Sequence, residues 1–225
     1  ARMIEVVRAG LCDLVMDQGR PGWGAFGVPA GGAADPAALA AANRLVGNDM
    51  SAAGLEILLS GPSLRFPDGG VASLTGARFG VSRGSGAPVP WNQTLVLAAG
   101  ETLSLGGAEA GCRCWLALRG GVAVPVVMGS RSTFLPGGFG GHFGRALKSG
   151  DVLATGGATA ALRLSRAQPP DADDGGCLLR VVAGPQLARF TDAGLAAFFG
   201  GRFRVTATSD RRGLHDVGGH DDSQR

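Results

Sequence analysis

The sequence predicts a mainly β protein with few helices, and three observations support this fold class. Short apolar and β-branched segments recur along the chain, separated by turns that contain Gly or Pro. The chain holds 40 glycines and 12 prolines without a collagen-like period, so turn-forming positions are frequent. Hydrophobic residues make up 45% and charged residues 17% of the 225 residues, which is typical of a globular chain that buries a core. Regular short strands of this kind indicate a closed barrel or a sandwich.

Most of the expected strands lie in the first 167 residues. They cover residues 4–8, 11–16, 55–59, 63–66, 71–74, 79–82, 89–91, 93–97, 101–105, 112–118, 122–127, 151–153 and 161–164. The run at residues 122–127 is apolar and β-branched, and we expect this strand to end at Met128.

Two helices are expected, at residues 36–46 and 191–199. Asp35 is a favourable N-cap for the first helix, and Pro36 suits the first helical position. The spacing of the apolar residues predicts a buried face that consists of Leu39, Ala42, Leu45 and Val46. Asn43 lies among these positions. It either bonds a neighbouring loop, which we favour, or contributes to a ligand pocket.

The best candidate for a domain boundary is the polar segment at residues 168–176, in which Ala172 is the only apolar residue besides proline. We therefore expect an N-terminal β-rich domain at residues 1–167, a linker at 168–176, and the start of a second β domain at 177–225. In this second domain, residues 178–182 and 203–207 are expected to be strands on either side of the second helix.

Residues 129–144 are the clearest candidate for a binding loop. Ser130, Arg131, Ser132 and Thr133 form a polar turn with one guanidinium, and a glycine-dense segment follows at residues 137–144. Glycines let backbone amides approach a ligand closely, and an arginine can bind a carboxylate or phosphate through two parallel hydrogen bonds. The same pattern is compatible with a structural surface connection in which the arginine is solvated.

Three other residues are functional candidates. For Arg20, which lies between glycines, a turn-stabilising role is favoured over contact with an anion. For Glu56, a salt bridge with an arginine is favoured over catalysis, because buried acids are usually paired. His142 could act as a base near neutral pH, but we do not assign it a catalytic role.

Composition and cysteine spacing argue against several classes of function. The net charge is +3 and there is no basic run, so nothing indicates binding to nucleic acid or to a membrane surface. The cysteines match no zinc or redox spacing, so we expect no metal site; they are Cys12, Cys112, Cys114 and Cys177. No apolar run is long enough for a membrane span and no signal-peptide pattern is visible, so we expect a cytoplasmic protein.

Several segments carry a resemblance to one protein family, in family order from about residue 4 to residue 211. They read DQGRPGWGAFGVPAGGAADPAALAAANRLVGN, LEILLSGPSLRF, LTGA, AGCRCWLALRGG, VPVVMGSRSTFL followed by GRALKSGD, and GPQLARF. On these motifs the chain is identified as a member of the family that comprises the C subunit of 5-oxoprolinase and is also called biotin-dependent carboxyltransferase, allophanate hydrolase subunit 2 or KipA-like.

The resemblance implies a fold of cyclophilin-like β-barrels and three competing functions. The first is a subunit of a heteromeric ATP-dependent 5-oxoprolinase, which opens the lactam of 5-oxoproline to glutamate. The second is the carboxyltransferase subunit of a urea-carboxylase or allophanate-type system, in which carboxybiotin delivers a carboxylate to a small amide. The third is a non-enzymatic, KipA-like antagonist of a sensor-kinase inhibitor. A chain of this size without a biotin-carrier motif or an ATP site of its own favours the first function over the second.

The first function implies site residues, a cofactor and partners. Arg131 and Ser132 are the candidate catalytic residues, which would hold the substrate carboxylate or the developing oxyanion. The candidate substrate-binding residues are Ser130, Thr133, Arg20 and Asn43. ATP would serve the assembled complex, and biotin would be needed only under the second function. The partners would be the homologous, KipI-like B subunit and the LamB/YcsF-like A subunit, without which we expect no activity.

The resemblance ends after Arg211. Relatives continue with a β-rich segment that completes a second barrel, so we expect a truncated chain whose second barrel is incomplete. We also expect residues after Asp210 to be poorly ordered, and an apolar face at residues 178–182 and at Phe198 and Phe199 to be exposed. Whether a truncated chain is active stays open.

Overall fold

The computed structural model describes residues 2–157, 180–206 and 216–218, and it confirms the mainly β prediction. The chain divides into two compact units, residues 1–171 and 172–225, which are described separately below. The linker predicted at residues 168–176 lies outside the described residues, so the predicted domain limits stay predictions. In the described ranges, no helix is long and apolar enough to cross a membrane.

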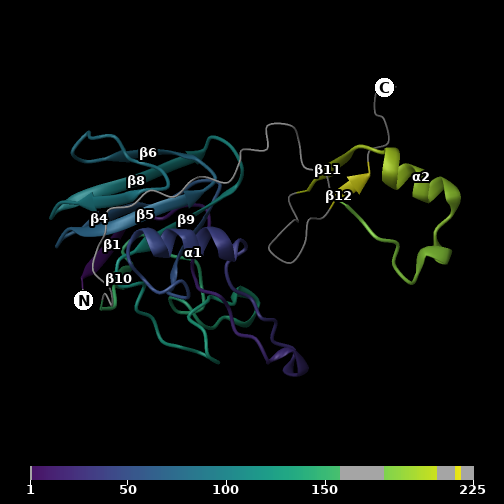
Figure 1. The fold of residues 1–225 in the computed structure, drawn as a ribbon, viewed down its shortest axis with the longest axis horizontal. Helices are drawn as coiled ribbons and strands as arrows, with labels where there is room; N and C mark the ends of the chain where they lie inside the picture. The colour runs from purple at the N-terminus through teal and green to yellow at the C-terminus, as the bar shows by residue number, and fades with distance from the viewer. Residues whose placement is uncertain (1, 158–179, 207–215, 219–225) are drawn as a thin grey trace. The chain divides into compact units, whose positions relative to one another are not determined.

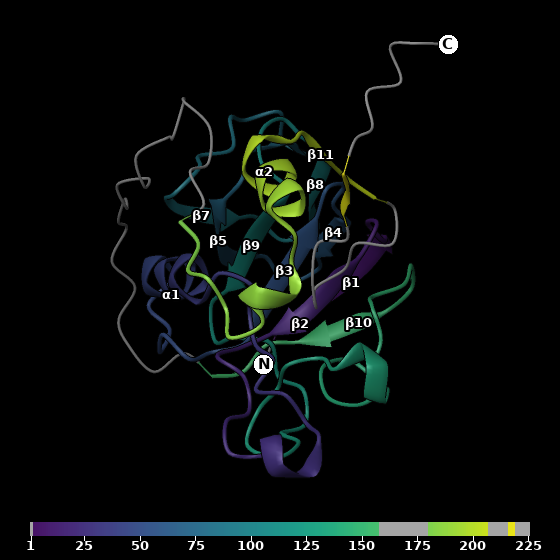
Figure 2. The same cartoon turned by 90° about the vertical axis from the view of Figure 1, so that its right-hand side faces the viewer.

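The first unit contains two five-stranded antiparallel sheets (Figure 1, Figure 2). The first sheet consists, in spatial order, of β10 (Val152–Ala154), β1 (Met3–Arg8), β4 (Ser63–Phe66), β8 (Glu101–Ala108) and β6 (Phe79–Arg83). The second consists of β2 (Asp13–Met16), β3 (Gly54–Leu58), β9 (Arg113–Leu118), β5 (Gly70–Gly76) and β7 (Thr94–Leu97). No closed barrel is formed by the described strands, so a cyclophilin-like barrel stays an expectation.

One apolar core is shared by the two sheets. Ile4 and Leu64 of the first sheet and Leu55 and Leu116 of the second are almost fully buried in it. In the strand register, Leu64 lies opposite Leu103, and Leu55 lies opposite Leu116. Burial of an aliphatic side chain of this size contributes roughly 1.5–3 kcal/mol, so these paired positions hold the unit together.

Helix α1 (Pro36–Leu45) packs against the second sheet and begins as predicted. The Asp35 side chain accepts a hydrogen bond from the backbone N–H of Ala38 at 2.9 Å, which caps the helix. The predicted face is confirmed as buried and consists of Leu39, Ala42, Leu45 and Val46. Three hydroxyls of the sheet donate to helix carbonyls, and they belong to Ser73, Thr75 and Thr94.

The strand predicted at residues 122–127 is wrong. The segment makes only two isolated bridges, between Val122 and Thr155 and between Val127 and Ser130. Pro125 in its middle has no backbone N–H to donate, so the β-branched composition does not lead to a paired strand. Residues 89–91 are also irregular, and the strand predicted at 161–164 lies outside the described residues.

The described residues of the second unit form a short 3-10 turn, one helix and a two-stranded sheet. These are η3 (Leu187–Arg189), α2 (Asp192–Gly200), β11 (Phe203–Val205) and β12 (Asp216–Gly218). Helix α2 confirms the second predicted helix, and Thr191 caps it by accepting a hydrogen bond from the Gly194 N–H at 3.1 Å. Strand β12 lies in the tail where we expected poor order, and residues 180–182 form no strand. The predicted apolar exposure is confirmed at Phe198 and Phe199.

Candidate functional site

Two loops of the first unit meet beside strand β2, and they contain most of the predicted site residues. The first loop, residues 17–32, follows β2 directly, and the second loop spans residues 130–144. Thr133 donates its backbone N–H and its hydroxyl to the carbonyl of Val15, at 2.9 and 3.0 Å. Since β2 lies at the edge of its sheet, the second loop covers an edge that would otherwise be exposed.

The carboxylate of Asp17 joins the two loops. Its Oδ1 accepts hydrogen bonds from the hydroxyls of Ser130 and Ser132, both at 2.6 Å, and from the N–H of Gly19 at 2.8 Å. Its Oδ2 accepts one from the backbone N–H of Arg131 at 2.5 Å. We call the group formed by Asp17, Ser130, Ser132 and the backbone of Arg131 the Asp17 clasp. With the N–H of Gly19, four donors satisfy this buried charge, which makes a rigid junction.

The clasp uses the hydroxyls of both serines that were predicted to belong to the site. Ser130 and Ser132 are almost fully buried, and their hydroxyl protons are donated to Asp17. The Ser132 oxygen also accepts from the backbone N–H of Asp17 at 2.8 Å. These two hydroxyls therefore hold the loops in this structure. The roles predicted for them and for Thr133 in catalysis or substrate binding stay predictions.

Arg131 is the exposed member of the predicted set. Its Nε donates to the carbonyl of Val124 at 3.1 Å, and the clasp fixes its backbone. The guanidinium is thus presented on the surface from a rigid base, as an anion-binding residue requires. Among the described residues, one cavity lies beside Phe66 and another lies in the second unit. Arg131 lines neither of them.

Arg20 is brought to the same place, but it is buried. Only 1% of the residue is exposed, and its guanidinium lies over the ring of Phe139, 5.1 Å from the ring centroid. Nη2 donates to the carbonyl of Ser132 and Nε to that of Val127 at 3.5 Å. Burial lowers the pKa of the guanidinium, and the nearby Asp17 carboxylate partly offsets this. Arg20 therefore ties the first loop to the second.

Asn43 is not brought to these loops. It lies buried on α1, where its Nδ2 donates to the carbonyl of Ala52 at 2.7 Å and its Oδ1 accepts from the Nδ2 of Asn48 at 2.9 Å. Both ends of the amide are used to hold the loop after the helix, which agrees with the interpretation favoured from the sequence. Its substrate-binding role stays a prediction.

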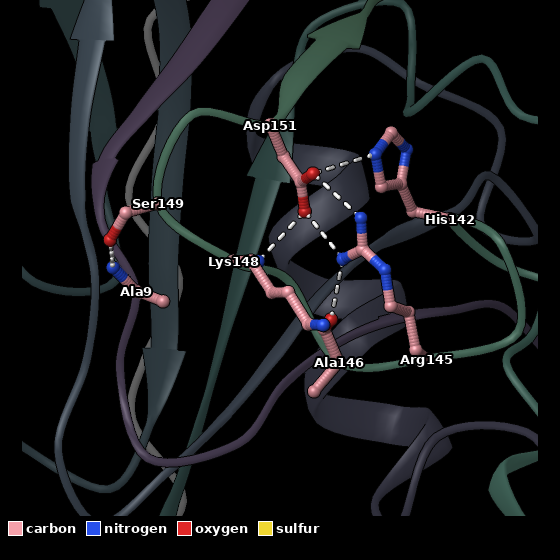
Figure 3. Close-up of polar contacts among 7 residues, drawn as sticks. All are labelled: Ala9, His142, Arg145, Ala146, Lys148, Ser149 and Asp151. Atoms are coloured by element: carbon pink, nitrogen blue, oxygen red, sulfur yellow. Dashed lines mark hydrogen bonds and ion pairs between the residues drawn. The ribbon is translucent and has the colours of Figure 1, made fainter.

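A second polar cluster lies just beyond the glycine-dense segment (Figure 3). Asp151 accepts two hydrogen bonds from Arg145, at 2.7 and 2.8 Å, and one from the N–H of Lys148 at 2.7 Å. Mainly because of Arg145, the pKa of the Asp151 carboxyl lies well below its usual range. The Nε2 of His142 lies 3.4 Å from Asp151 Oδ1, the same oxygen that accepts from Arg145 Nη2 (Figure 3). The distance between His142 and Asp151 is too long for a strong hydrogen bond. The ion pair between Arg145 and Asp151 supports the loop.

Glu56 forms an ion pair with Arg113 at 3.3 Å and accepts the N–H of Ala34 at 2.8 Å, so the salt-bridge interpretation is confirmed.

Asp17 and Phe139 belong to the site and were missed. An acid directly after a buried strand and two residues before Gly19 was the signal available for Asp17. Within the described ranges, no group of three His, Cys, Asp or Glu side chains could hold a metal ion.

Comparison with known proteins places this arrangement in a family. Residues 26–224 match the family described as the carboxyltransferase domain, subdomains A and B. The chain belongs to the carboxyltransferase domain family. Arg131 and the second loop lie inside the matched range, whereas Asp17 and Arg20 of the first loop precede it.

Several members of the carboxyltransferase family are similar over long stretches. The 5-oxoprolinase C subunit of Escherichia coli is 37% identical over 94% of this chain and 67% of its own length. The urea amidolyase of Saccharomyces cerevisiae is 40% identical over 67% of this chain but only 8% of its own length. The crystal structure of the Kluyveromyces lactis urea carboxylase has a TM-score of 0.80 and 33% identity, over 96% of this chain and 20% of that one. The chain therefore spans only a small part of the yeast relatives.

Proposed function

We propose that this chain is a subunit of a heteromeric, ATP-dependent 5-oxoprolinase that opens 5-oxoproline to glutamate. The observation that carries the proposal is the similarity to the 5-oxoprolinase C subunit of E. coli, which extends over 94% of this chain. The urea amidolyase of S. cerevisiae is matched over a shorter part of the chain, 67%.

In this proposal Arg131 is the residue that touches the substrate. Its exposed guanidinium would hold the carboxylate of the substrate or the oxyanion that develops when the lactam is attacked. Ser132 and Ser130 would act as positioning residues, because their hydroxyls fix the backbone on which Arg131 stands. Thr133 would support the same loop through its bonds to β2.

The remaining parts of the reaction are assigned to partners. The surroundings of Arg131 offer one exposed guanidinium and no nucleotide-sized cavity among those that we describe, so the loops do not fit ATP. We therefore place ATP on the other two subunits, which would be the KipI-like B subunit and the LamB/YcsF-like A subunit. Among the described residues, Cys112 and Cys114 are free thiols, which is compatible with our proposal of a cytoplasmic complex.

Co-expression with the two partner subunits, followed by an assay of ATP hydrolysis, tests the proposal. Hydrolysis that depends on both 5-oxoproline and this chain is the expected result. A complex that assembles but hydrolyses ATP equally well without this chain would refute it.

A carboxyltransferase function is the second candidate, and the urea amidolyase and urea carboxylase relatives favour it. The same complex can be tested with a biotin carboxylase, a biotin carrier and urea in place of 5-oxoproline. ATP turnover that depends on urea and on biotin would favour this candidate over the first. Binding to the KipI-like partner without any turnover would favour the KipA-like function.

A further inference from the structure

One nitrogen of Arg20 lacks a partner. Nη1 is fully buried, and no acceptor lies within hydrogen-bond distance of it in the described part of the chain. The other two nitrogens donate to the carbonyls of Ser132 and Val127. A buried donor without a partner is costly, and a buried charge without a counter-charge is more so.

The nearest acid does not supply that partner. Asp17 interacts with Arg20 through space, but its two oxygens accept from the four donors of the clasp and of Gly19. Among the described residues, no carboxylate oxygen lies within the 4.0 Å that defines an ion pair with Arg20. The guanidinium is thus held by neutral carbonyls, and its charge is balanced only at a distance.

The first loop covers Nη1 at Gly31. Gly31 is exposed and has a left-handed backbone (φ 61°), and a methyl group at this position would lie 3.7 Å from Nη1. Gly31 therefore lies directly beside this nitrogen, and a side chain at this position would contact it. Residues 21–27 of the loop are exposed throughout, so this part of the loop can shift without losing core contacts.

We propose that Arg20 Nη1 is the receptor for a small carboxylate, which enters beneath Gly31 when the first loop moves. A carboxylate oxygen can accept a charge-assisted hydrogen bond from Nη1, and the carboxylate supplies the negative charge that the described residues do not. The Phe139 ring covers the face of the guanidinium, which limits the ligand to a small one. The proposal concerns the chain alone and does not rest on the proposed function, so its failure would leave that function unaffected.

The test measures binding of acetate to the full chain by calorimetry, with acetamide and with chloride at equal ionic strength as comparisons. Gly31→Ala is the diagnostic variant, because the added methyl would cover Nη1. Gly27→Ala is its matched control: Gly27 is in the same loop and also left-handed (φ 76°), but a methyl there meets nothing within 4 Å. The backbone strain is therefore similar in both variants.

Saturable binding of acetate to the wild type and to Gly27→Ala is expected, with binding to Gly31→Ala roughly tenfold to a hundredfold weaker. Arg20→Gln should abolish binding, and if that variant does not fold, the two glycine variants decide. The proposal is overturned if the wild type does not bind acetate, if acetamide or chloride binds as well, or if Gly31→Ala and Gly27→Ala bind acetate equally.

Discussion

Ser132 and Asp17 exchange two hydrogen bonds although 115 residues separate them in the sequence. The serine hydroxyl donates to the carboxylate at 2.6 Å, and the backbone N–H of Asp17 donates to the serine oxygen at 2.8 Å. One small side chain thus satisfies a charged acceptor and a buried backbone donor at once. This reciprocity makes Ser132 the residue on which the junction of the two loops depends.

Replacement of Ser132 by Ala should destabilise the first unit by about 2–3 kcal/mol, because a buried N–H loses its acceptor and a carboxylate loses a donor. Urea unfolding followed by circular dichroism measures the change. Ser82→Ala is the control, since Ser82 is exposed on β6 and should be unaffected within about 0.5 kcal/mol. Equal stabilities of the two variants would show that the clasp contributes nothing.

Replacement of Arg131 by Ala should remove turnover of the assembled complex and leave the free energy of unfolding within about 0.5 kcal/mol of the wild type. The reason is that the guanidinium is exposed and makes one hydrogen bond, to a carbonyl. Arg78→Ala, at another exposed arginine, serves as the control for a general loss of charge. Full activity of Arg131→Ala would mean that the loop is structural and that the proposed site is wrong.

Asp13 should make the protein less stable as the pH rises. Burial raises the pKa of its carboxyl from 3.8 to about 6, although the N–H of Gly10 and the charge of Arg8 act in the opposite direction. A group whose pKa is higher in the folded state binds more protons there, so stability falls as the pH rises from about 4 to about 6 and stays reduced above. Asp13→Asn should therefore be more stable than the wild type at neutral pH, by up to about 3 kcal/mol.

Thermal unfolding at about pH 5 and about pH 7 measures this difference, which should widen with rising pH. Asp68→Asn, at an exposed aspartate, should show no such widening. A difference between wild type and Asp13→Asn that stays constant with pH would contradict the role assigned to the carboxyl.

Glu101 should make the protein less stable as the pH falls, the opposite of the effect predicted for Asp13. Arg83 donates to it at 2.6 and 2.7 Å and is the main cause of a pKa well below the usual range, with further bonds from Ser85 and the N–H of Ala98. The folded state therefore binds fewer protons, and this stability is present above the unfolded pKa of 4.5 and is lost as the pH falls below it. Glu101→Gln should cost about 3 kcal/mol at neutral pH and should flatten the acid limb of the stability curve. Glu109→Gln, at an exposed glutamate, is the control. An acid limb of Glu101→Gln as steep as that of the wild type would rule out this role of the Glu101 carboxyl.

The sequence predicts those parts of the fold that depend on local chemistry. Helix α1 was found because Asp35 and Pro36 mark its start and the apolar spacing marks its buried face. The strand predicted at residues 122–127 failed because a β-branched run needs a partner strand, and pairing is not a local property. The candidate loop was located for a similar local reason, since the polar turn around Arg131 is a contiguous motif.

The partners within the site could not be predicted in the same way. Nothing near Ser130 or Ser132 in the sequence indicates that Asp17 uses their hydroxyl protons, because that contact depends on how two distant loops meet. The burial of Arg20 beneath Gly31 is also a property of the assembled loops. A residue type shows which bonds a side chain can make, but only the fold decides which of them are made.

The glycines of the first loop divide it into a part that cannot vary and a part that can. At Gly19 and Gly32 an added methyl group would collide with backbone atoms of the opposite side of the loop, whereas at Gly22, Gly24 and Gly27 it would meet nothing within 4 Å. Side chains therefore have space at the tip, where only the left-handed backbone of Gly22 and Gly27 opposes them, and collide at the base. Descendants of this chain could acquire a new surface at the tip, and with it a new specificity, while the junction beneath is inherited unchanged.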